Sequence, residues 1–249
     1  MKSKKKSKKR IDFLLKEKGF VSSREKAQAL ILAGKVIVND VKITKAGEEI
    51  AEDALIRVSE PEHPYVSRGA LKLIQAIEDF QIKIENKICM DVGASTGGFT
   101  EVLLLNGAKK IFAVDVGINQ LDWKIRSDAR VFVKEKYNAR YLKEEDFESK
   151  IDLFVFDVSF ISLNLVVPPT LTLRQEGTEW VTLIKPQFEV GPAHVGKGGI
   201  VKSEERRIEA VENITKNLEK IGLKRKGLIE SPIKGTKGNI EFLALWRMD

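Results

Sequence analysis

The 249-residue sequence predicts an α/β protein in which a small α+β module precedes a doubly wound, mostly parallel sheet. From residue 68 onward, apolar runs of strand length alternate with helical stretches, which is typical of a sheet with helices on both faces. Apolar residues make up 43% of the chain, enough for a sizeable core. Two prolines in the segment 59–67 predict a linker between the two parts.

Composition excludes several classes of protein. The chain has no uninterrupted apolar stretch of about 18 residues, which argues against a transmembrane helix. No apolar segment follows the basic N-terminus, so we expect no secretory signal and a soluble, cytoplasmic protein. A single cysteine, Cys89, and two histidines provide too few ligands for a typical metal site, and we expect none. The oligomeric state stays open.

Residues 1–10 form a basic tail. They contain six lysines and one arginine without any acid, whereas the rest of the chain balances 36 basic against 36 acidic side chains. Such a block is typical of a solvated, disordered tail. It is equally typical of an arm that contacts phosphates or an anionic membrane surface, and both interpretations stay open.

Residues 11–58 are expected to fold as a compact module. The predicted elements are a helix that starts at a Ser22-x-x-Glu25 capping box and buries Ala27, Leu30 and Ile31, a stop at Gly34, a strand at 36–38, an Asn39-Asp40 turn and a strand near 55–58. Three basic residues, Arg24, Lys26 and Lys35, cluster around the helix without being needed for its core. They indicate either a solvated face or a contact with RNA.

The part from residue 68 to 249 is expected to form the larger sheet. Its sequence has no internal repeat. We expect strands near 87–92, 111–116, 131–133, 152–157, 179–185, 224–231 and 239–246. We expect helices near 68–80, 98–106, 119–126, 164–174 and 204–221. The loop 186–201 contains four glycines and few apolar residues, which is the composition of a mobile lid.

A glycine-rich turn follows the first strand of this part. Gly93, Gly97 and Gly98 allow the backbone to approach a ligand closely, but their spacing does not match the dinucleotide pattern G-x-G-x-x-G. This favours a ligand with a ribose but no pyrophosphate. Asp115 ends the next strand, 22 positions after Gly93, near the usual offset of a ribose-binding acid. The alternative for the glycines is a tight packing turn.

Charged residues interrupt or end three very apolar strands. Asp157 and Lys185 lie at strand carboxyl ends, as do Asp91 and Asp115, and open α/β sheets bind ligands at that edge. Glu241 lies at a strand beginning and reaches the same edge if the last strand is antiparallel. A charge in so apolar a strand is costly unless it is paired or solvated. A structural ion pair of Lys185 with Glu241 or with Asp157 is the alternative to a catalytic role.

Arg68 and Lys72 stand one turn apart on the helix expected at 68–80. Like charges at this spacing destabilise a helix slightly, and no carboxylate stands three or four residues from Lys72. The pair therefore indicates an anionic neighbour elsewhere, such as phosphate, or a solvated face.

From about Arg10 to the C-terminus, the sequence resembles the TlyA-type family, often labelled haemolysins, which are ribosomal RNA 2′-O-ribose methyltransferases. The resemblance is carried by the segments 23–27 (SREKA), 66–73 (VSRGALKL), 91–100 (DVGASTGGFT), 157–162 (DVSFIS), 185–189 (KPQFE) and 238–242 (GNIEF). Their order and number make chance an improbable explanation. The junction at 63–66 is a weak match to the family's linker, which bears on how the two domains are coupled.

The resemblance implies an S4-type RNA-binding domain at 11–58 and, at 68–249, an FtsJ-like domain with a Rossmann-like sheet of about seven strands, the last antiparallel, that uses S-adenosyl-L-methionine. The implied Lys-Asp-Lys-Glu catalytic tetrad is Lys72, Asp157, Lys185 and Glu241. The implied cofactor-binding residues are Asp91, Gly93, Ala94, Ser95, Thr96, Gly97, Gly98 and Asp115. Contacts with RNA are expected from Arg10, Arg24, Lys26, Lys35 and Arg68.

The implied substrate is a cytidine ribose in small- or large-subunit ribosomal RNA, and the implied partners are ribosomal subunits. Lys185 is expected to contact the reacting 2′-hydroxyl, either as a base or as a group that orients the hydroxyl and stabilises its oxyanion. Glu189, Asn138 and Arg140 stay candidates to line the cofactor or the lid.

Three other functions remain as alternatives. A membrane-acting cytolysin would need a large amphipathic or spanning segment, and we expect no stable membrane insertion. An RNA-binding protein without catalysis would not need the tetrad and the glycine loop. Methylation of a small molecule or of a base is disfavoured only by the resemblance.

Overall fold

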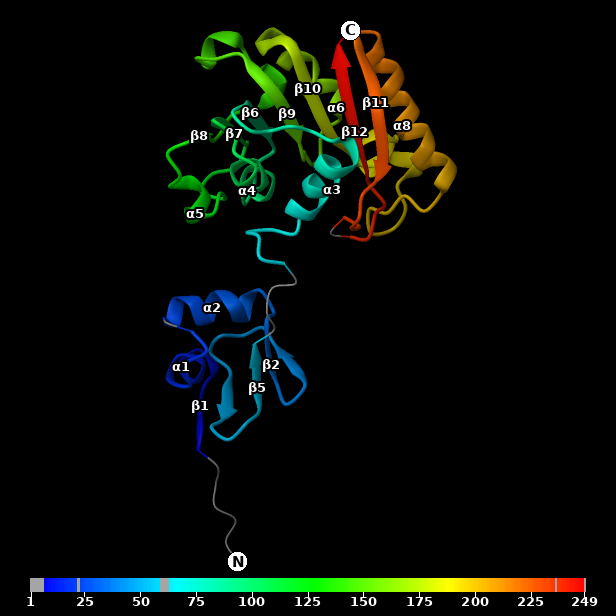
Figure 1. Ribbon diagram of the computed structural model, residues 1–249. Helices are drawn as coiled ribbons and strands as arrows, with labels where there is room; N and C mark the ends of the chain where they lie inside the picture. The colour runs from blue at the N-terminus through cyan, green and yellow to red at the C-terminus, as the bar shows by residue number, and fades with distance from the viewer. Residues whose placement is uncertain (1–6, 22, 59–62, 236, 249) are drawn as a thin grey trace, which may run out of the picture. The chain divides into compact units, whose positions relative to one another are not determined.

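The computed structural model describes residues 7–21, 23–58, 63–235 and 237–248 (Figure 1). Its backbone contacts divide the chain into two compact units, Met1–Pro64 and Tyr65–Asp249. Each unit has its own hydrophobic core. Within the described ranges, no helix is both long enough and apolar enough to cross a membrane.

The first unit packs two helices against short strands. Its elements are β1 (Lys8–Arg10), α1 (Ile11–Glu17), α2 (Arg24–Leu32), β2 (Val36–Val38), β3 (Val41–Ile43), β4 (Glu49–Ala51) and β5 (Ile56–Val58). Strands β3, β2 and β5 form one sheet, and β1 pairs with β4. Asn39 and Asp40 both have positive φ, 47° and 65°, so the predicted turn is confirmed as the tight connection between β2 and β3.

A buried carboxylate organises the basic residues of this unit. Asp12 is fully buried and accepts hydrogen bonds from Arg10, Arg24 and Gln28. Burial alone would raise the pKa of Asp12, but the hydrogen bonds from these three side chains together lower it well below its usual range. Arg24 also lies 4.2 Å from the centre of the Phe13 ring. Arg10 and Arg24 therefore hold the first unit together, whatever they contact outside it.

Three features of the first unit differ from the sequence expectations. Residues 8–10 of the basic tail form β1, because their backbone completes a pair with β4, and residues 1–6 lie outside the described chain. Ser22 also lies outside it, and the N-cap of α2 is Ser23, whose side chain accepts from the Lys26 amide at 3.3 Å. Helix α1 was not predicted, although Ile11, Leu14 and Leu15 give it a buried face.

The second unit contains the predicted seven-stranded sheet. Its strands are β6 (Ile88–Val92), β7 (Lys110–Val114), β8 (Val131–Lys134), β9 (Ile151–Phe156), β10 (Arg174–Ile184), β11 (Leu223–Glu230) and β12 (Phe242–Met248). They lie in the order β11-β12-β10-β9-β6-β7-β8. The central strands run parallel, and β12 is antiparallel to both of its neighbours, as predicted.

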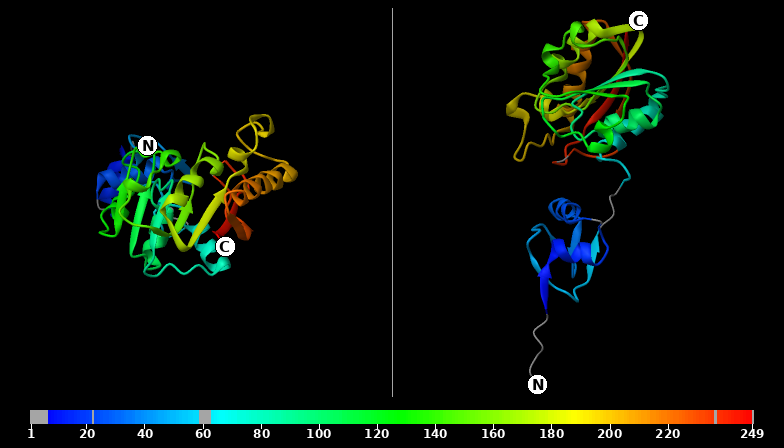
Figure 2. Two further views of the ribbon diagram at one scale, coloured as in Figure 1. Left: turned by 90° about the horizontal axis from the view of Figure 1, so that it is seen from above. Right: turned by 90° about the vertical axis from the view of Figure 1, so that its left-hand side faces the viewer.

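Helices cover both faces of this sheet (Figure 2). They are α3 (Ala70–Phe80), α4 (Gly98–Leu105), α5 (Trp123–Arg126), α6 (Leu163–Val166), α7 (Pro186–Glu189) and α8 (Glu204–Glu219), with 3₁₀ turns η1 (Ala139–Tyr141), η2 (Glu144–Asp146), η3 (Pro168–Leu173) and η4 (Pro192–His194). Along β12, Leu243 and Leu245 join the core with α3 and α4, whereas Ala244 and Trp246 join the core with α8. Burial on both faces explains why the strands are almost continuously apolar.

The helix expected at 164–174 is wrong as a single element. The structure has the short helix α6, then the 3₁₀ turn η3, because Pro168 and Pro169 remove backbone donors and break the α-helical ladder. Strand β10 begins earlier than expected, at Arg174, with an irregular register before Glu179. Helix α5 is shorter than expected, only four residues from Trp123 to Arg126.

Candidate active site

One edge of the large sheet gathers the charged residues that the sequence singled out. Asp157 and Lys185 follow β9 and β10 by one residue, and Glu241 precedes β12 by one residue. Because β12 is antiparallel to β10, with Phe242 opposite Ile184, its beginning lies beside the end of β10. A cavity of about 590 Å³ opens at this edge, a size typical of small-ligand sites.

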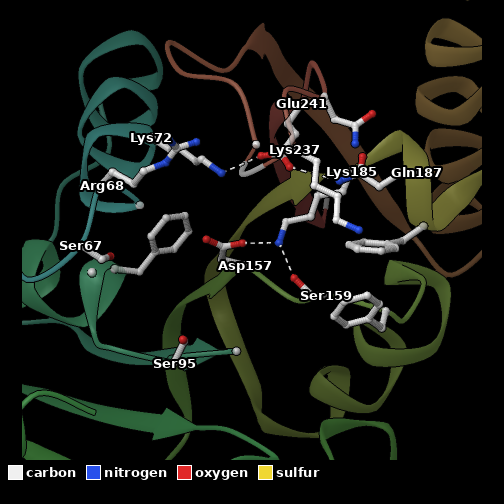
Figure 3. Close-up of a pocket in the computed structure, with 18 of the residues that line it drawn as sticks. Ser67, Arg68, Lys72, Ser95, Asp157, Ser159, Lys185, Gln187, Lys237 and Glu241 are labelled. Atoms are coloured by element: carbon white, nitrogen blue, oxygen red, sulfur yellow. Dashed lines mark hydrogen bonds and ion pairs between the residues drawn. The ribbon is translucent and has the colours of Figure 1, made fainter. Parts of the chain in front are cut away.

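The four residues of the expected tetrad form two ion pairs in this cavity (Figure 3). Lys72 Nζ lies 2.6 Å from Glu241 Oε2, and Lys185 Nζ lies 2.6 Å from Asp157 Oδ1. Lys185 also donates to Ser159 Oγ at 2.9 Å. Lys72 reaches the site from α3, so three sheet ends and one helix build it.

Three members of the tetrad are nearly buried, with exposed fractions of 6% for Lys72, 8% for Lys185 and 2% for Glu241. Burial of charge is tolerated because each lysine has a carboxylate partner. The anionic neighbour expected for Lys72 is Glu241, and the alternative of a solvated face is wrong for this residue. Of the two structural pairs considered for Lys185, the one with Asp157 is present.

The glycine-rich turn forms one wall of the cavity. Gly93 has a φ of +88°, and a Cβ atom there would lie 2.7 Å from the Asp157 carbonyl oxygen. At Gly98, a Cβ atom would collide with Ser67 Oγ. Close packing therefore requires both glycines, and the same turn leaves Ala94, Ser95 and Thr96 facing the cavity. Tight packing and ligand approach are compatible here.

Asp115 lies beside the glycine turn with its carboxylate held in place. Its oxygens accept hydrogen bonds from the Ser95 amide at 2.8 Å and the Gly117 amide at 2.7 Å. A small hollow next to it is lined by Ala94, Ser95, Asp115 and Gln120, among others. A preset carboxylate beside a glycine turn suits the hydroxyl groups of a ribose. The residues present therefore fit a nucleoside cofactor.

Asp91 lies behind the turn and does not line the cavity. It is fully buried, and its Oδ2 accepts from Thr100 Oγ1 at 2.6 Å, while Oδ1 has no hydrogen-bond partner among the described residues. Burial raises the pKa of Asp91 to about 7, and the nearby charges of Asp157 and Asp115 raise it further, against the hydrogen bonds from Thr100. Asp91 can therefore act on a ligand only through the turn that it supports.

Several cavity residues were not found from the sequence. Phe160 and Phe188 lie with their ring centres 5.0 Å apart, and Phe160 is 88% exposed. Phe160 also has a φ of +64°, which is rare for an aromatic residue. Gln187 donates to Glu241 Oε1 at 3.3 Å, and Lys237 lines the opening. Phe160, Gln187 and Phe188 lie in segments that carry the family resemblance, and Lys237 lies four residues before Glu241 in the sequence, but neither observation assigned them a role.

The glycine-rich loop expected to form a lid is fastened at its end. Asn239 is 3% exposed, accepts from the Val201 amide at 2.9 Å and donates to the Gly199 carbonyl at 2.8 Å. Val195 and Gly199 line the cavity. The loop therefore covers part of the site and is joined to the segment that carries Glu241.

Other candidate residues have structural partners. Glu189 accepts from Ser162 Oγ at 2.5 Å and from the Leu163 amide at 3.0 Å, at the start of α6, and burial raises its pKa. Asn138 accepts from the Arg140 amide at 3.0 Å and caps η1. None of Glu189, Asn138 and Arg140 lines the cavity.

The residues expected to contact RNA fall in both units. Arg68 lines the cavity opening and donates to the Lys234 carbonyl. In the first unit, Lys26 is exposed and Lys35 is half-buried, whereas Arg10 and Arg24 are engaged with Asp12.

Comparison with protein families assigns both units. Residues 65–248 match the model of the FtsJ-like methyltransferases, and residues 9–56 match the model of the S4 domain. The 16S/23S rRNA (cytidine-2′-O)-methyltransferase TlyA of Mycobacterium tuberculosis is 42% identical over 95% of this chain and 88% of its own length.

Two further relatives carry a different name. Hemolysin A of Brachyspira hyodysenteriae is 45% identical over 94% of this chain and 98% of its own length. The solved structure of a Streptococcus thermophilus protein, whose name also contains the word hemolysin, has a TM-score of 0.75 and 42% identity, and the match covers 98% of this chain and 90% of that chain.

Proposed function

Since this chain belongs to the TlyA-type branch of the FtsJ-like methyltransferases, we propose that it methylates a ribose 2′-oxygen of ribosomal RNA, a cytidine by analogy with its named relatives. The observation that carries this proposal is the shared cavity. It joins the glycine turn at one end to Lys72, Asp157, Lys185 and Glu241 at the other. A cofactor and an acceptor bound there would meet in one place, which supports direct transfer between them.

The methyltransferase fold implies S-adenosyl-L-methionine as the methyl donor. When bound, this cofactor supplies a methyl group that is activated by its positive sulfur. The turn 93–98 would hold it by close backbone approach, and Asp115 would accept hydrogen bonds from its ribose hydroxyls. Asp91 would keep the turn in position through Thr100.

Lys185 would orient the acceptor. Its ammonium group has three N–H donors, and Asp157 and Ser159 accept from it in the structure. A further donor is therefore available for the ribose 2′-oxygen, which would be held and stabilised while its proton passes to water and the new C–O bond forms as the methyl group separates from the sulfur. Asp157 would fix the direction of Lys185, and Glu241 would do the same for Lys72.

The surroundings of the tetrad suit a nucleotide. The exposed Phe160 and its neighbour Phe188 offer an aromatic face on which an unstacked base can lie. The S4 domain would supply a separate contact with ribosomal RNA. Ribosomal subunits as the substrate would place the reaction in the cytoplasm.

The deciding experiment is transfer of labelled methyl from S-adenosyl-L-methionine to unmodified ribosomal subunits. We expect the wild type to label RNA at a position that becomes resistant to alkaline cleavage. Lys185→Ala should lower the rate at least about 100-fold, because it removes the group that orients the oxygen. Its affinity for the cofactor and its unfolding transition should stay close to those of the wild type.

Lys216→Ala is the matched control, because Lys216 is exposed on α8 and lies outside the cavity. Bound cofactor without label on either subunit would make the substrate assignment wrong. No cofactor binding at all would overturn the proposal that the protein is a methyltransferase. It would favour an RNA-binding protein without catalysis. Equal loss of activity in Lys216→Ala would show that the loss is unspecific.

A further inference from the structure

The two ion pairs leave positive charge unbalanced at the cavity. The charged side chains that line it are Arg68, Lys72, Lys185, Lys237, Asp157 and Glu241. Glu241 and Asp157 form ion pairs with the two buried lysines, Lys72 and Lys185. No salt bridge joins Arg68 or Lys237 to a carboxylate within the described part of the chain, and both are exposed. They therefore form a surplus of two positive charges at the opening.

Lys237 is held at the opening by the segment around it. Its side chain lies against Gly199, since a Cβ atom there would be 3.6 Å from Lys237 Nζ. Gly199 is itself fastened to Asn239 through the hydrogen bond of 2.8 Å. Two loops far apart in the sequence thus meet beside Lys237, which lines the cavity.

Arg68 stands on the other side of the same segment. Its guanidinium donates to the Lys234 carbonyl, and it lies just before α3, four residues ahead of Lys72. Figure 3 shows Arg68 and Lys72 extending from one side of the cavity, and Lys185 and Lys237 from the other. Arg68 and Lys237 thus line the same cavity as Lys185, into which an acceptor must enter.

We propose that Arg68 and Lys237 bind the backbone phosphates on either side of the target nucleotide. In an RNA chain, C2′ carries the hydroxyl group and the adjacent C3′ carries the 3′-phosphate through its oxygen. The 5′-phosphate is bonded through the 5′-oxygen at the other end of the same sugar. A ribose held by Lys185 therefore brings two negative groups to the opening. Arg68 can bind one as a planar fork and Lys237 the other as a point charge.

This inference rests on the proposed function and adds to it a requirement on the substrate. The methyl acceptor must be a nucleotide within a phosphodiester chain, and a free nucleoside would lack both contacts. The carboxylate of the cofactor is the competing ligand for the two cations. The two ligands can be distinguished by measurement. Removal of a cation that binds the cofactor carboxylate would weaken cofactor affinity, whereas removal of a cation that binds an RNA phosphate would not.

The test compares Lys237→Gln and Lys237→Arg with the control Lys216→Gln, which removes the same charge from α8. We expect Lys237→Gln to raise the KM for unmodified ribosomal subunits about fivefold, with kcat within about twofold of the wild type. The slope of log KM against log salt should fall by about 0.7 to 0.9. Lys237→Arg should retain the wild-type values, and Arg68→Gln should behave like Lys237→Gln.

Cofactor affinity, measured by calorimetry without RNA, should be unchanged in Lys237→Gln. A weaker cofactor affinity would instead assign Lys237 to the cofactor and overturn the inference. The same KM and salt slope in Lys237→Gln and Lys216→Gln would also overturn it, while methylation by the wild type would leave the proposed function intact. Failure of the wild type to methylate ribosomal RNA would overturn both.

Discussion

Asp91 is a buried carboxylate directly behind the cofactor turn, and its protonation links the stability of the fold to pH. Burial raises its pKa to about 7, above the ordinary value near 3.8. Between these two values the folded state binds more protons than the unfolded state, so the contribution of Asp91 to stability is complete below about pH 4 and falls as pH rises to about 7.

Asp91→Asn replaces this group by a neutral side chain of the same shape. We expect the variant to gain stability relative to the wild type as pH rises from 5 to 8, by at most about 3 kcal/mol, because about two pH units of the shift in pKa lie within this range. Denaturant unfolding of both proteins across this range measures the difference. A difference that does not change with pH would show that Asp91 does not titrate there.

The tetrad shows why single residues at this site cannot be interpreted separately. Lys72 and Glu241 are almost completely buried, and removal of one leaves the other as an unpaired charge. Lys185 and Asp157 are the more accessible pair, because the Asp157 side chain is 24% exposed. This difference supports a direct contact with substrate for Lys185 and a supporting role for Lys72.

At the scale of elements, the turn between β6 and α4 depends on a glycine at position 93. Gly93→Ala places a Cβ atom 2.7 Å from the Asp157 carbonyl and in a backbone conformation with φ of +88°. We expect cofactor affinity to fall at least about tenfold and stability to fall by about 2 kcal/mol or more, because the turn and the end of β9 must separate. Calorimetry and denaturant unfolding measure these effects.

Gly177→Ala is the control for the backbone contribution. Gly177 also has positive φ, +77°, but no atom lies within 4 Å of the position of an added Cβ. It should lose about 1 kcal/mol of stability and keep its cofactor affinity. Similar losses of affinity in both variants would indicate general strain instead of a specific contact with β9.

For the whole molecule, the division into two units predicts a division of labour. Lys26 is exposed on α2 of the first unit, where Arg24 is bound to buried Asp12. Lys26→Gln should raise the KM for ribosomal subunits about twofold to threefold at low salt, with a smaller effect at higher salt, and leave cofactor affinity unchanged. Arg24→Gln should instead destabilise the first unit, because it removes a partner from a buried carboxylate.

Thermal unfolding and methyl transfer at two salt concentrations measure both variants. A change in cofactor affinity without RNA in Lys26→Gln would contradict the division. An Arg24→Gln protein that unfolds like the wild type would show that Arg10 and Gln28 suffice to hold Asp12.

The sequence by itself determined the strands of the large sheet and three of the four tetrad positions at its edge. Apolar runs report burial on both faces, and a charge within or just beyond such a run is conspicuous because it must be paired or solvated. Asp157, Lys185 and Glu241 were found in this way. The spacing from Gly93 to Asp115 also predicted a ribose-binding acid, since the helix and the strand between the two residues set this distance along the chain.

Only the tertiary structure decided which charges are partners. The choice between Glu241 and Asp157 for Lys185 depends on the insertion of β12 between β10 and β11, and on α3 bringing Lys72 to Glu241. The position of Lys237 at the cavity also depends on the tertiary structure, because it lies where two loops meet. Periodicity in a sequence describes how each element faces the core, whereas partners across a cavity are set by the order in which the elements pack.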